Sequence, residues 1–251
     1  MNRPFLPLVI LTILLLVSCA QPVLPEPRPT PEIVTVALDS SIWPLHRALR
    51  ICSEAHPDLV VSLQEISPAY QDWTAFDLVF RLGEPEDLPP FAAPLGVEEL
   101  AVVVNTSNPS RVLSDEELEG IFSGRYSRWS DVGGPFRPIQ VWVYPDGETM
   151  NQSIDETFIP DRAFTSHALL APNAAAMLEA ISGDPNSIGF LPHAWLDDSV
   201  HVIEVDPETR QKLQLPLLAL AVSEPAGAAG RLLYCLQQGD GSEEIFRLYE
   251  S

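Results

Sequence analysis

The residues whose types and spacing suggest chemistry gather first in one short stretch, Val143–Asn151, which reads VYPDGETMN. It has the pattern of a strand end, a tight turn and the first turn of a helix. A helix N-terminus presents free backbone N–H groups and is a natural seat for an anion. Asp146 and Glu148 lie in the same turn, where their carboxylates would repel an anion. The stretch therefore predicts the shape of an anion site without its electrostatics.

Motifs for catalysis and for metal binding are absent from the sequence. There is no Gly-x-Ser-x-Gly elbow, no cysteine with a plausible histidine partner and no glycine-rich phosphate loop. We therefore expect that the protein is not an enzyme. The five histidines show no metal-ligand spacing with one another or with cysteine, so we expect no metal site and no cofactor. Cys52 and Cys235 form either a disulfide or two buried thiols, and both alternatives stay open.

The charge of the chain narrows the class of partner. There are 35 acidic residues against 14 basic ones, which gives a formal net charge of −21 at pH 7. Nucleic-acid binding needs clustered lysine and arginine, so this balance excludes nucleic acid as a partner. A negative field also slows the approach of an anion, although local donors override it at contact. The 251 residues suffice for one large domain or for two small lobes.

The N-terminal residues are typical of an exported lipoprotein. Residues 1–18 have a cationic start and an apolar run shorter than the ~20 residues of a membrane span, which predicts a signal peptide. Leu16–Cys19 resembles the bacterial lipobox, so we expect lipid attachment at Cys19; an uncleaved anchor helix or an ordinary signal sequence is the alternative. Residues 19–32 are rich in proline and predict an extended tether. Each alternative places the body outside the cytoplasm, and the lipoprotein reading anchors it to the cell membrane.

The elements that would position the turn alternate between strands and helices. Expected strands cover residues 33–38, 59–66, 75–82, 98–107, 138–145, 187–192, 200–205 and 215–222. Expected helices lie between Ser41 and His56 and over residues 114–124, 150–159, 173–183, 229–238 and 242–250. Ser114 and Glu117 have the spacing of a capping box, and Gly183 is the expected stop of its helix. The first strand, helix and strand predict a parallel crossover and an α/β architecture.

The segment LSDEELEGIFSGRYSRWSDVGG resembles the phosphate-binding proteins of bacterial phosphate ABC transporters and their type II periplasmic-binding relatives. Ile121–Gly124 and Trp129–Gly134 match motifs of that family, and flanking pieces keep the order of the family from about residue 33 to residue 192. The resemblance implies two Rossmann-like α/β lobes with a ligand cleft between them. Lobe I would be residues 33–102 plus 193–251, and lobe II would be residues 103–192. The hinge would be the two chain crossings near Val104 and Pro192.

The same resemblance implies a ligand site in which some family residues are replaced. The family's first-loop hydroxyls correspond to Ser40 and Ser41, and its aspartate corresponds to Asp77. Tyr144 stands in place of its arginine, and Gly147, Glu148 and Thr149 stand in place of its Ser-Gly-Thr turn, of which Thr149 is kept. Loss of the arginine removes a charge-assisted bond worth ~1.5–3 kcal/mol. The remaining sources of positive charge are few, and Arg81 is either that source or a solvated residue at a strand end.

Each of these residues also has a purely structural reading. Ser40 and Ser41 would equally cap a helix, and Asp77 would equally join a structural hydrogen-bond network. Tyr70, Trp73 and Tyr144 would either line a pocket for a neutral organic ligand or fill the cleft.

The expected function is that of a monomeric, lipid-anchored solute-binding protein that delivers phosphate or a related oxyanion to an ABC permease. Two alternatives use the same fold. One binds a different, neutral organic ligand, and the other is a ligand-free sensor or interaction protein.

Overall fold

The computed structural model describes residues 30–67, 72–160 and 162–249. The chain divides into two units, Met1–Thr30 and Pro31–Ser251, and all the secondary structure described lies in the second. The predicted signal peptide, Cys19 and nearly all of the predicted tether therefore lie outside the described residues. Within the described part, no helix has the length and apolar character needed to cross a membrane.

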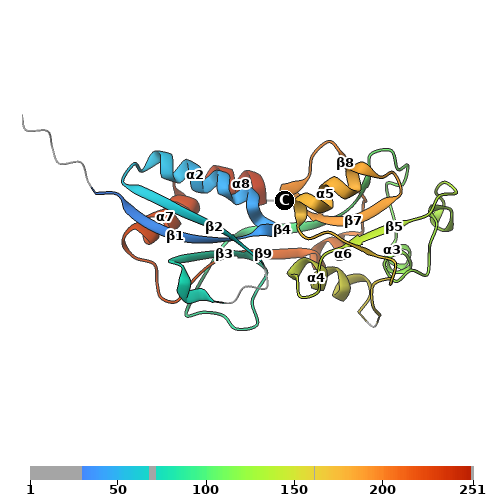
Figure 1. Ribbon diagram of the computed structural model, residues 1–251, viewed down its shortest axis with the longest axis horizontal. Coiled ribbons are helices and arrows are strands. Elements are labelled where there is room, and N and C mark those ends of the chain that lie inside the picture. The colour runs from blue at the N-terminus through green and yellow to red at the C-terminus, as the bar shows by residue number, and fades with distance from the viewer. Residues whose placement is uncertain (1–29, 68–71, 161, 250–251) are drawn as a thin grey trace, which may run out of the picture. The chain divides into compact units, whose positions relative to one another are not determined.

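In the described part of this unit, nine strands alternate with several helices (Figure 1). The strands are β1 (Glu32–Asp39), β2 (Leu59–Ile66), β3 (Leu78–Leu82), β4 (Phe91–Asn105), β5 (Gln140–Val143), β6 (Leu169–Leu170), β7 (Ser187–Pro192), β8 (Val200–Val202) and β9 (Gln214–Ala221). The α-helices are α2 (His46–Ala55), α3 (Asp115–Phe122), α4 (Thr149–Phe158), α5 (Ala174–Gly183), α6 (Pro207–Lys212), α7 (Gly227–Gln238) and α8 (Ser242–Tyr249). Short 3-10 helices are η1 (Ser40–Leu45), η2 (Trp73–Ala75), η3 (Trp129–Val132) and η4 (His193–Trp195).

The strands form a mixed sheet in the order β2-β1-β3-β9-β4-β7-β5-β6, with β8 also paired to β4. β1 pairs in parallel with β2 and with β3, as the strand–helix–strand pattern predicts. β9 is antiparallel to both β3 and β4. Because parallel strands end at the same edge, the carboxyl ends of β1 and β3 bring Asp39 and Leu82 together.

The two parts of β4 pair with different strands. Its first part, Phe91–Glu99, pairs with β9, and its last part pairs with β7 and β8. The helices divide in the same way. α2, α7 and α8 pack on one another near β1 and β2, whereas α5 packs on β7 (Figure 1). β8, which falls in the expected lobe I, pairs with the end of β4 after Val102, which falls in the expected lobe II. The lobe boundaries expected from the sequence stay a prediction.

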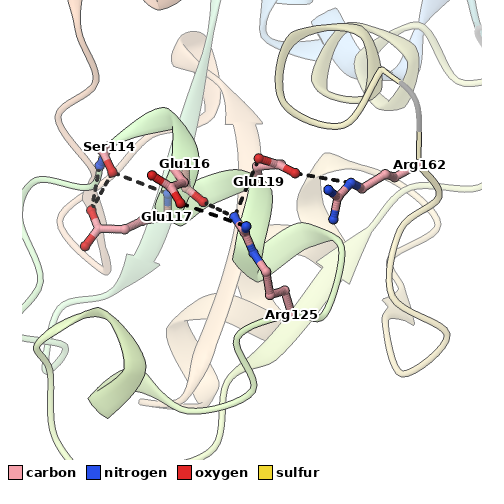
Figure 2. A network of polar contacts seen from close by, with 6 residues as sticks. All are labelled: Ser114, Glu116, Glu117, Glu119, Arg125 and Arg162. Atoms are coloured by element: carbon pink, nitrogen blue, oxygen red, sulfur yellow. Dashed lines mark hydrogen bonds and ion pairs between the residues drawn. The ribbon is translucent and has the colours of Figure 1, made fainter.

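The family-like segment forms α3 and the turns after it. Ser114 caps α3 through a reciprocal pair with Glu117, which is the expected capping box (Figure 2). The side chains of Trp129 and Phe122 are completely buried. On the outer face of α3, Arg125 contacts Glu116 and Glu119 and Arg162 contacts Glu119, so these surface charges are paired (Figure 2).

The structure settles or corrects several details of the sequence interpretation. Cys52 and Cys235 form a disulfide that joins α2 to α7. The cap of η1 is Asp39 and not Ser40 or Ser41. Gly183 is the last residue of α5 and does not end it in a left-handed conformation. The helix α6 was not expected, because it is a single short stretch begun by Asp206 and Pro207.

Candidate functional site

Asp39 organises the loop at the carboxyl end of β1. Its Oδ1 accepts hydrogen bonds from the backbone N–H and the hydroxyl of Ser41, both at 2.8 Å. Its Oδ2 accepts from the backbone N–H of Leu82 at 3.3 Å. Asp39 and Ser41 are buried, while Ser40 is half-buried at the start of η1. The Ser41 hydroxyl donates its proton to Asp39, so its lone pairs are what it can offer to another group.

The environment of Asp39 opposes its ionisation. Burial raises the pKa of the Asp39 carboxyl above its ordinary value, while the bonds from Ser41 and Leu82 and the charge of Arg81 partly offset that rise. Both oxygens of this carboxylate thus hold the backbone at the ends of β1 and β3. Asp39 is therefore a structural anchor of the first loop.

Arg81 brings a buried cation to the same edge of the sheet. It follows Phe80, which is opposite Leu38 in the β1–β3 register, so Arg81 stands beside Asp39. Its Nη2 lies 3.5 Å from Oγ1 of Thr149, and its guanidinium lies 5.8 Å from the ring centroid of Trp73. Only 7% of Arg81 is exposed, and burial lowers its pKa while the carboxylate of Asp39 opposes that change. A guanidinium stays charged under these conditions.

The turn singled out from the sequence meets Arg81 at the first residue of α4. Glu148 is the N-cap residue of α4, Thr149 is its first residue, and Gly147 has φ +84° in the exposed turn before it. A Cβ atom on Gly83, which has φ +73°, would lie 2.5 Å from Cγ2 of Thr149. The glycine thus lets the end of β3 touch the N-terminus of α4.

A pocket of about 460 Å³ adjoins this contact. It is lined by Gly83, Glu84, Thr149, Gln152, Ser153, Glu156, Thr157, Lys212 and Leu215. Hydroxyl and amide groups of α4 form one wall, and Lys212 is the cationic residue of the lining. The pocket is a polar space next to the Arg81–Thr149 contact.

Glu148 is the group whose charge decides what this place can bind. Burial, and then the nearby charge of Asp39, raise its pKa to about 7, although a bond from the Ser67 hydroxyl at 3.3 Å opposes the rise. Near neutral pH its carboxyl is therefore divided between a neutral and a charged form. The neutral form can donate a hydrogen bond, whereas the charged form repels an anion.

Two residues proposed from the sequence lie elsewhere. Tyr144 is buried, its hydroxyl donates to the Phe190 carbonyl at 3.0 Å, and its ring packs edge-on against Phe190. Asp77 is exposed and accepts from the backbone N–H and the hydroxyl of Thr35, both at 2.7 Å. It precedes β3 and lies four positions before Arg81, which corresponds to roughly 13 Å along a strand.

The structure thus groups Ser41 and Thr149 with Arg81, and it leaves Asp77 and Tyr144 outside that group. The sequence interpretation did not include Asp39, and it left Arg81 undecided. A sequence signal for both residues was available: Asp39 and Arg81 lie at the ends of two apolar strands, which pair in parallel. Trp73 lies beside Arg81, while Tyr70 lies outside the described residues.

Comparison with known proteins gives matches over much of the chain. Residues 78–228, more than half of the chain, match the PBP superfamily domain. The phosphate-binding protein PstS of Bacillus subtilis (strain 168) is 25% identical over 161 residues, which cover 60% of this chain and 53% of that protein. The chain thus matches about half the length of that relative.

Two solved structures have the same fold. A putative phosphate ABC transporter substrate-binding protein with bound phosphate from Clostridium perfringens has a TM-score of 0.74 at 19% identity, covering 85% of this chain and 98% of the other. An ABC-type phosphate transport receptor from Vibrio cholerae has a TM-score of 0.65 at 20% identity, covering 86% and 98%. These likenesses confirm the expected type II periplasmic-binding-protein fold.

Proposed function

The chain belongs to the PBP superfamily, and from that premise we propose that it is an extracytoplasmic solute-binding protein of an ABC-type importer. The solute is an oxyanion, phosphate or a close relative. The chain is held at the membrane by a lipid on Cys19 and works as a monomer beside a permease. Its role is binding and delivery, not catalysis. The names of the relatives in Bacillus, Clostridium and Vibrio support this assignment.

The observation that carries the proposal is the position of Arg81. A desolvated oxyanion needs donors and a positive charge. The Arg81 guanidinium is almost fully buried and reaches Thr149 at the N-terminus of α4, which offers free N–H groups. Tyr144 stands where the family places its arginine, so we assign the cationic role to Arg81, which approaches the same helix end from β3.

In this site the ligand would lie where the end of β3 meets the N-terminus of α4, and residues on each side would bind it. Ser40, Ser41 and Arg81 supply the first side, and Gly147 and Thr149 supply the second. Asp77 and Tyr144, which the resemblance also suggested, would act indirectly, through the bond of Asp77 to Thr35 and that of Tyr144 to Phe190. The lobes bounded near Val104 and Pro192 would close on the ligand by a hinge motion.

One observation favours a second candidate, a protein of the same fold that binds a neutral organic ligand. Glu148 is the N-cap residue of α4, the helix end where an oxyanion would have to lie, and its carboxyl makes no capping hydrogen bond there. When ionised, it cancels part of the attraction of Arg81 for an anion, but it would accept a hydrogen bond from a hydroxyl of a neutral ligand. The burial of Asp39, Ser41 and Arg81 is also what a filled cleft, and hence a sensor protein, would have.

Thermal unfolding of the full-length chain with and without millimolar phosphate, with sulfate at equal ionic strength as the control, tests the proposal. A ligand at a hundred times its Kd stabilises by about 2.7 kcal/mol, which raises Tm by roughly 5–10 °C for a chain of this size. We expect phosphate to raise Tm in the wild-type protein and in Arg50→Ala, whose arginine is an exposed helix residue. We expect no rise in Arg81→Ala.

Three outcomes would contradict parts of this proposal. A rise with phosphate that survives Arg81→Ala would remove Arg81 from the site and keep the function. A rise with neutral solutes alone would favour the second candidate. No rise with any solute would favour the ligand-free protein.

A further inference from the structure

A second group of ligand-type side chains lies where α2, α7 and the turn before α8 meet. His56, Cys235 and Asp240 each offer one ligand atom, and these atoms all lie within 4.8 Å of one another. Cys52 is bonded to Cys235, with 5.9 Å between their Cα atoms. Four side chains of metal-binding type therefore converge, two from each of two chain segments.

The end of α2 holds the first pair in place. Cys52 and His56 are four residues apart, which puts them on the same face of a helix. The backbone N–H of His56 donates to the Cys52 carbonyl at 3.1 Å, and the His56 carbonyl accepts from Leu59 at 2.8 Å. The His56 backbone is therefore fixed at the end of α2, one helical turn after Cys52.

The turn after α7 holds the second pair in place. The backbone N–H groups of Gly239 and Gly241 donate to the Cys235 carbonyl at 3.1 Å and 3.2 Å. A Cβ atom would lie 2.9 Å from Cα of Cys235 at Gly239 and 2.6 Å from Sγ of Cys52 at Gly241. Two glycines thus allow the turn to press against the disulfide, and Asp240 stands between them.

We propose that reduction of this disulfide creates a binding site for a soft divalent cation such as Zn²⁺. Both cysteine thiolates, the His56 imidazole and the Asp240 carboxylate are its ligands. Two sulfurs, one nitrogen and one oxygen suit tetrahedral Zn²⁺, whereas Mg²⁺ and Ca²⁺ prefer oxygen ligands. The ion has a path from solvent, because Asp240 is exposed and His56 is half-buried.

The chemistry of the switch balances with a thiol or phosphine reductant. The reductant supplies two electrons: two thiols become a disulfide, or a phosphine becomes a phosphine oxide with oxygen from water. The S–S bond breaks, and each sulfur takes up one proton. Binding of Zn²⁺ then displaces these two protons, since thiolates are the ligands, and it requires neutral His56. The disulfide and the metal exclude each other, and each of them joins α2 to α7.

The test is metal binding by the full-length chain before and after reduction with a phosphine. Co²⁺ serves as the probe, because its absorption reports tetrahedral geometry and thiolate ligation, and Zn²⁺ is then added in competition. We expect one equivalent of Co²⁺ to bind with a thiolate charge-transfer band in the reduced chain only. We expect His56→Ala and Asp240→Asn each to weaken binding about tenfold or more, since loss of an outer-shell partner alone costs 10–100-fold.

Matched controls are His167→Ala and Asp198→Asn, two exposed residues outside the cluster, and they should bind as the wild-type chain does. Thermal unfolding gives a second readout, which remains informative even if reduction unfolds the chain. Zn²⁺ should raise its Tm, or refold it if reduction unfolds it, and His56→Ala should reduce that effect. The proposal is wrong if the reduced chain shows no thiolate-bound Co²⁺, if Zn²⁺ leaves the reduced chain unchanged, or if the cluster variants match the controls.

Discussion

At the scale of single residues, the candidate site is a balance between one cation and two carboxyls. Arg81 attracts an anion to the N-terminus of α4, and Thr149 adds a hydroxyl there. Asp39 is engaged by Ser41 and Leu82, so it holds the loop and takes little part in ligand choice. Glu148 remains, and its state of protonation sets the sign of the local field.

The first prediction concerns Glu148→Gln. The pKa of Glu148 is raised to about 7, so wild-type Glu148 is mostly ionised at pH 8 and mostly neutral at pH 6. Glutamine is neutral at both. We expect the variant to bind phosphate about tenfold more tightly than wild type at pH 8, which corresponds to ~1.4 kcal/mol of lost repulsion, and about equally at pH 6.

Isothermal calorimetry of both proteins at each pH measures this ratio of Kd values. The titration of phosphate itself cancels, because the two proteins are compared in the same buffer. Asp198→Asn, which alters an exposed acid outside this turn, is the control and should leave Kd nearly unchanged. A ratio that does not vary with pH would remove Glu148 from the ligand's surroundings.

At the scale of elements, short local signals define the helix ends, and the ends position the site. The N-terminus of α3 is one example, since Ser114 and Glu117 exchange hydrogen bonds across its first turn (Figure 2). The sequence predicted this capping box because its residues are three apart. It did not predict Asp39 as the cap of η1, because two serines follow Asp39 and are equally good caps by type.

The second prediction uses that capping box. Ser114→Ala removes the hydroxyl that accepts from the backbone N–H of Glu117 and donates to its carboxylate. We expect the free energy of unfolding to fall by about 1 kcal/mol and Tm to fall by roughly 2–4 °C. Ser166→Ala, at an exposed serine outside any helix, is the control. Equal Tm values for the two variants would mean that the cap contributes nothing to stability.

At the scale of the whole described unit, Glu98 connects β4 to the residue that follows β7. It lies in β4 just before the strand changes neighbour, from Leu215 of β9 to Pro192 of β7. Its Oε1 accepts from the backbone N–H of His193 at 2.7 Å, and its buried Oε2 has no partner among the described residues. Further along η4, Trp195 donates to the carbonyl of Ser41 in the first loop.

Glu98 also links stability to pH. Burial raises its pKa from 4.5 to about 8, the charge of Glu99 adds to the rise, and the bond from His193 opposes it. The folded state holds the proton of the Glu98 carboxyl more tightly than the unfolded state does. This protonation therefore stabilises the fold fully below pH 4.5, and its contribution to the free energy of unfolding is lost as pH rises through about 8.

The third prediction is that Glu98→Gln removes this dependence. Glutamine keeps the shape and the acceptor for His193 and cannot ionise. Relative to wild type, its free energy of unfolding should rise by on the order of a few kcal/mol between pH 5 and pH 9. Urea unfolding at both values measures the difference, with Glu86→Gln at an exposed acid as the control. A parallel loss of stability in wild type and variant would assign the pH dependence to other groups.

The sequence by itself determined the class of fold and most of its elements. Alternating strands and helices, the capping box at Ser114 and the Ile121–Gly124 motif depend on residues close in the chain, and such patterns are visible without coordinates. The length of β4 and the short helix α6 were less clear, because packing against distant strands decides them.

Only the tertiary structure decided which of the candidate residues meet. Asp39 and Arg81 come together through the parallel register of β1 and β3, and Thr149 joins them through the close approach that Gly83 allows. Asp77 is separated from Arg81 by the length of one strand. The disulfide joins residues 183 positions apart in the chain, and the same packing brings His56 and Asp240 to it. Local sequence patterns specify elements, whereas side-chain constellations depend on contacts between segments whose separation along the chain carries no such signal.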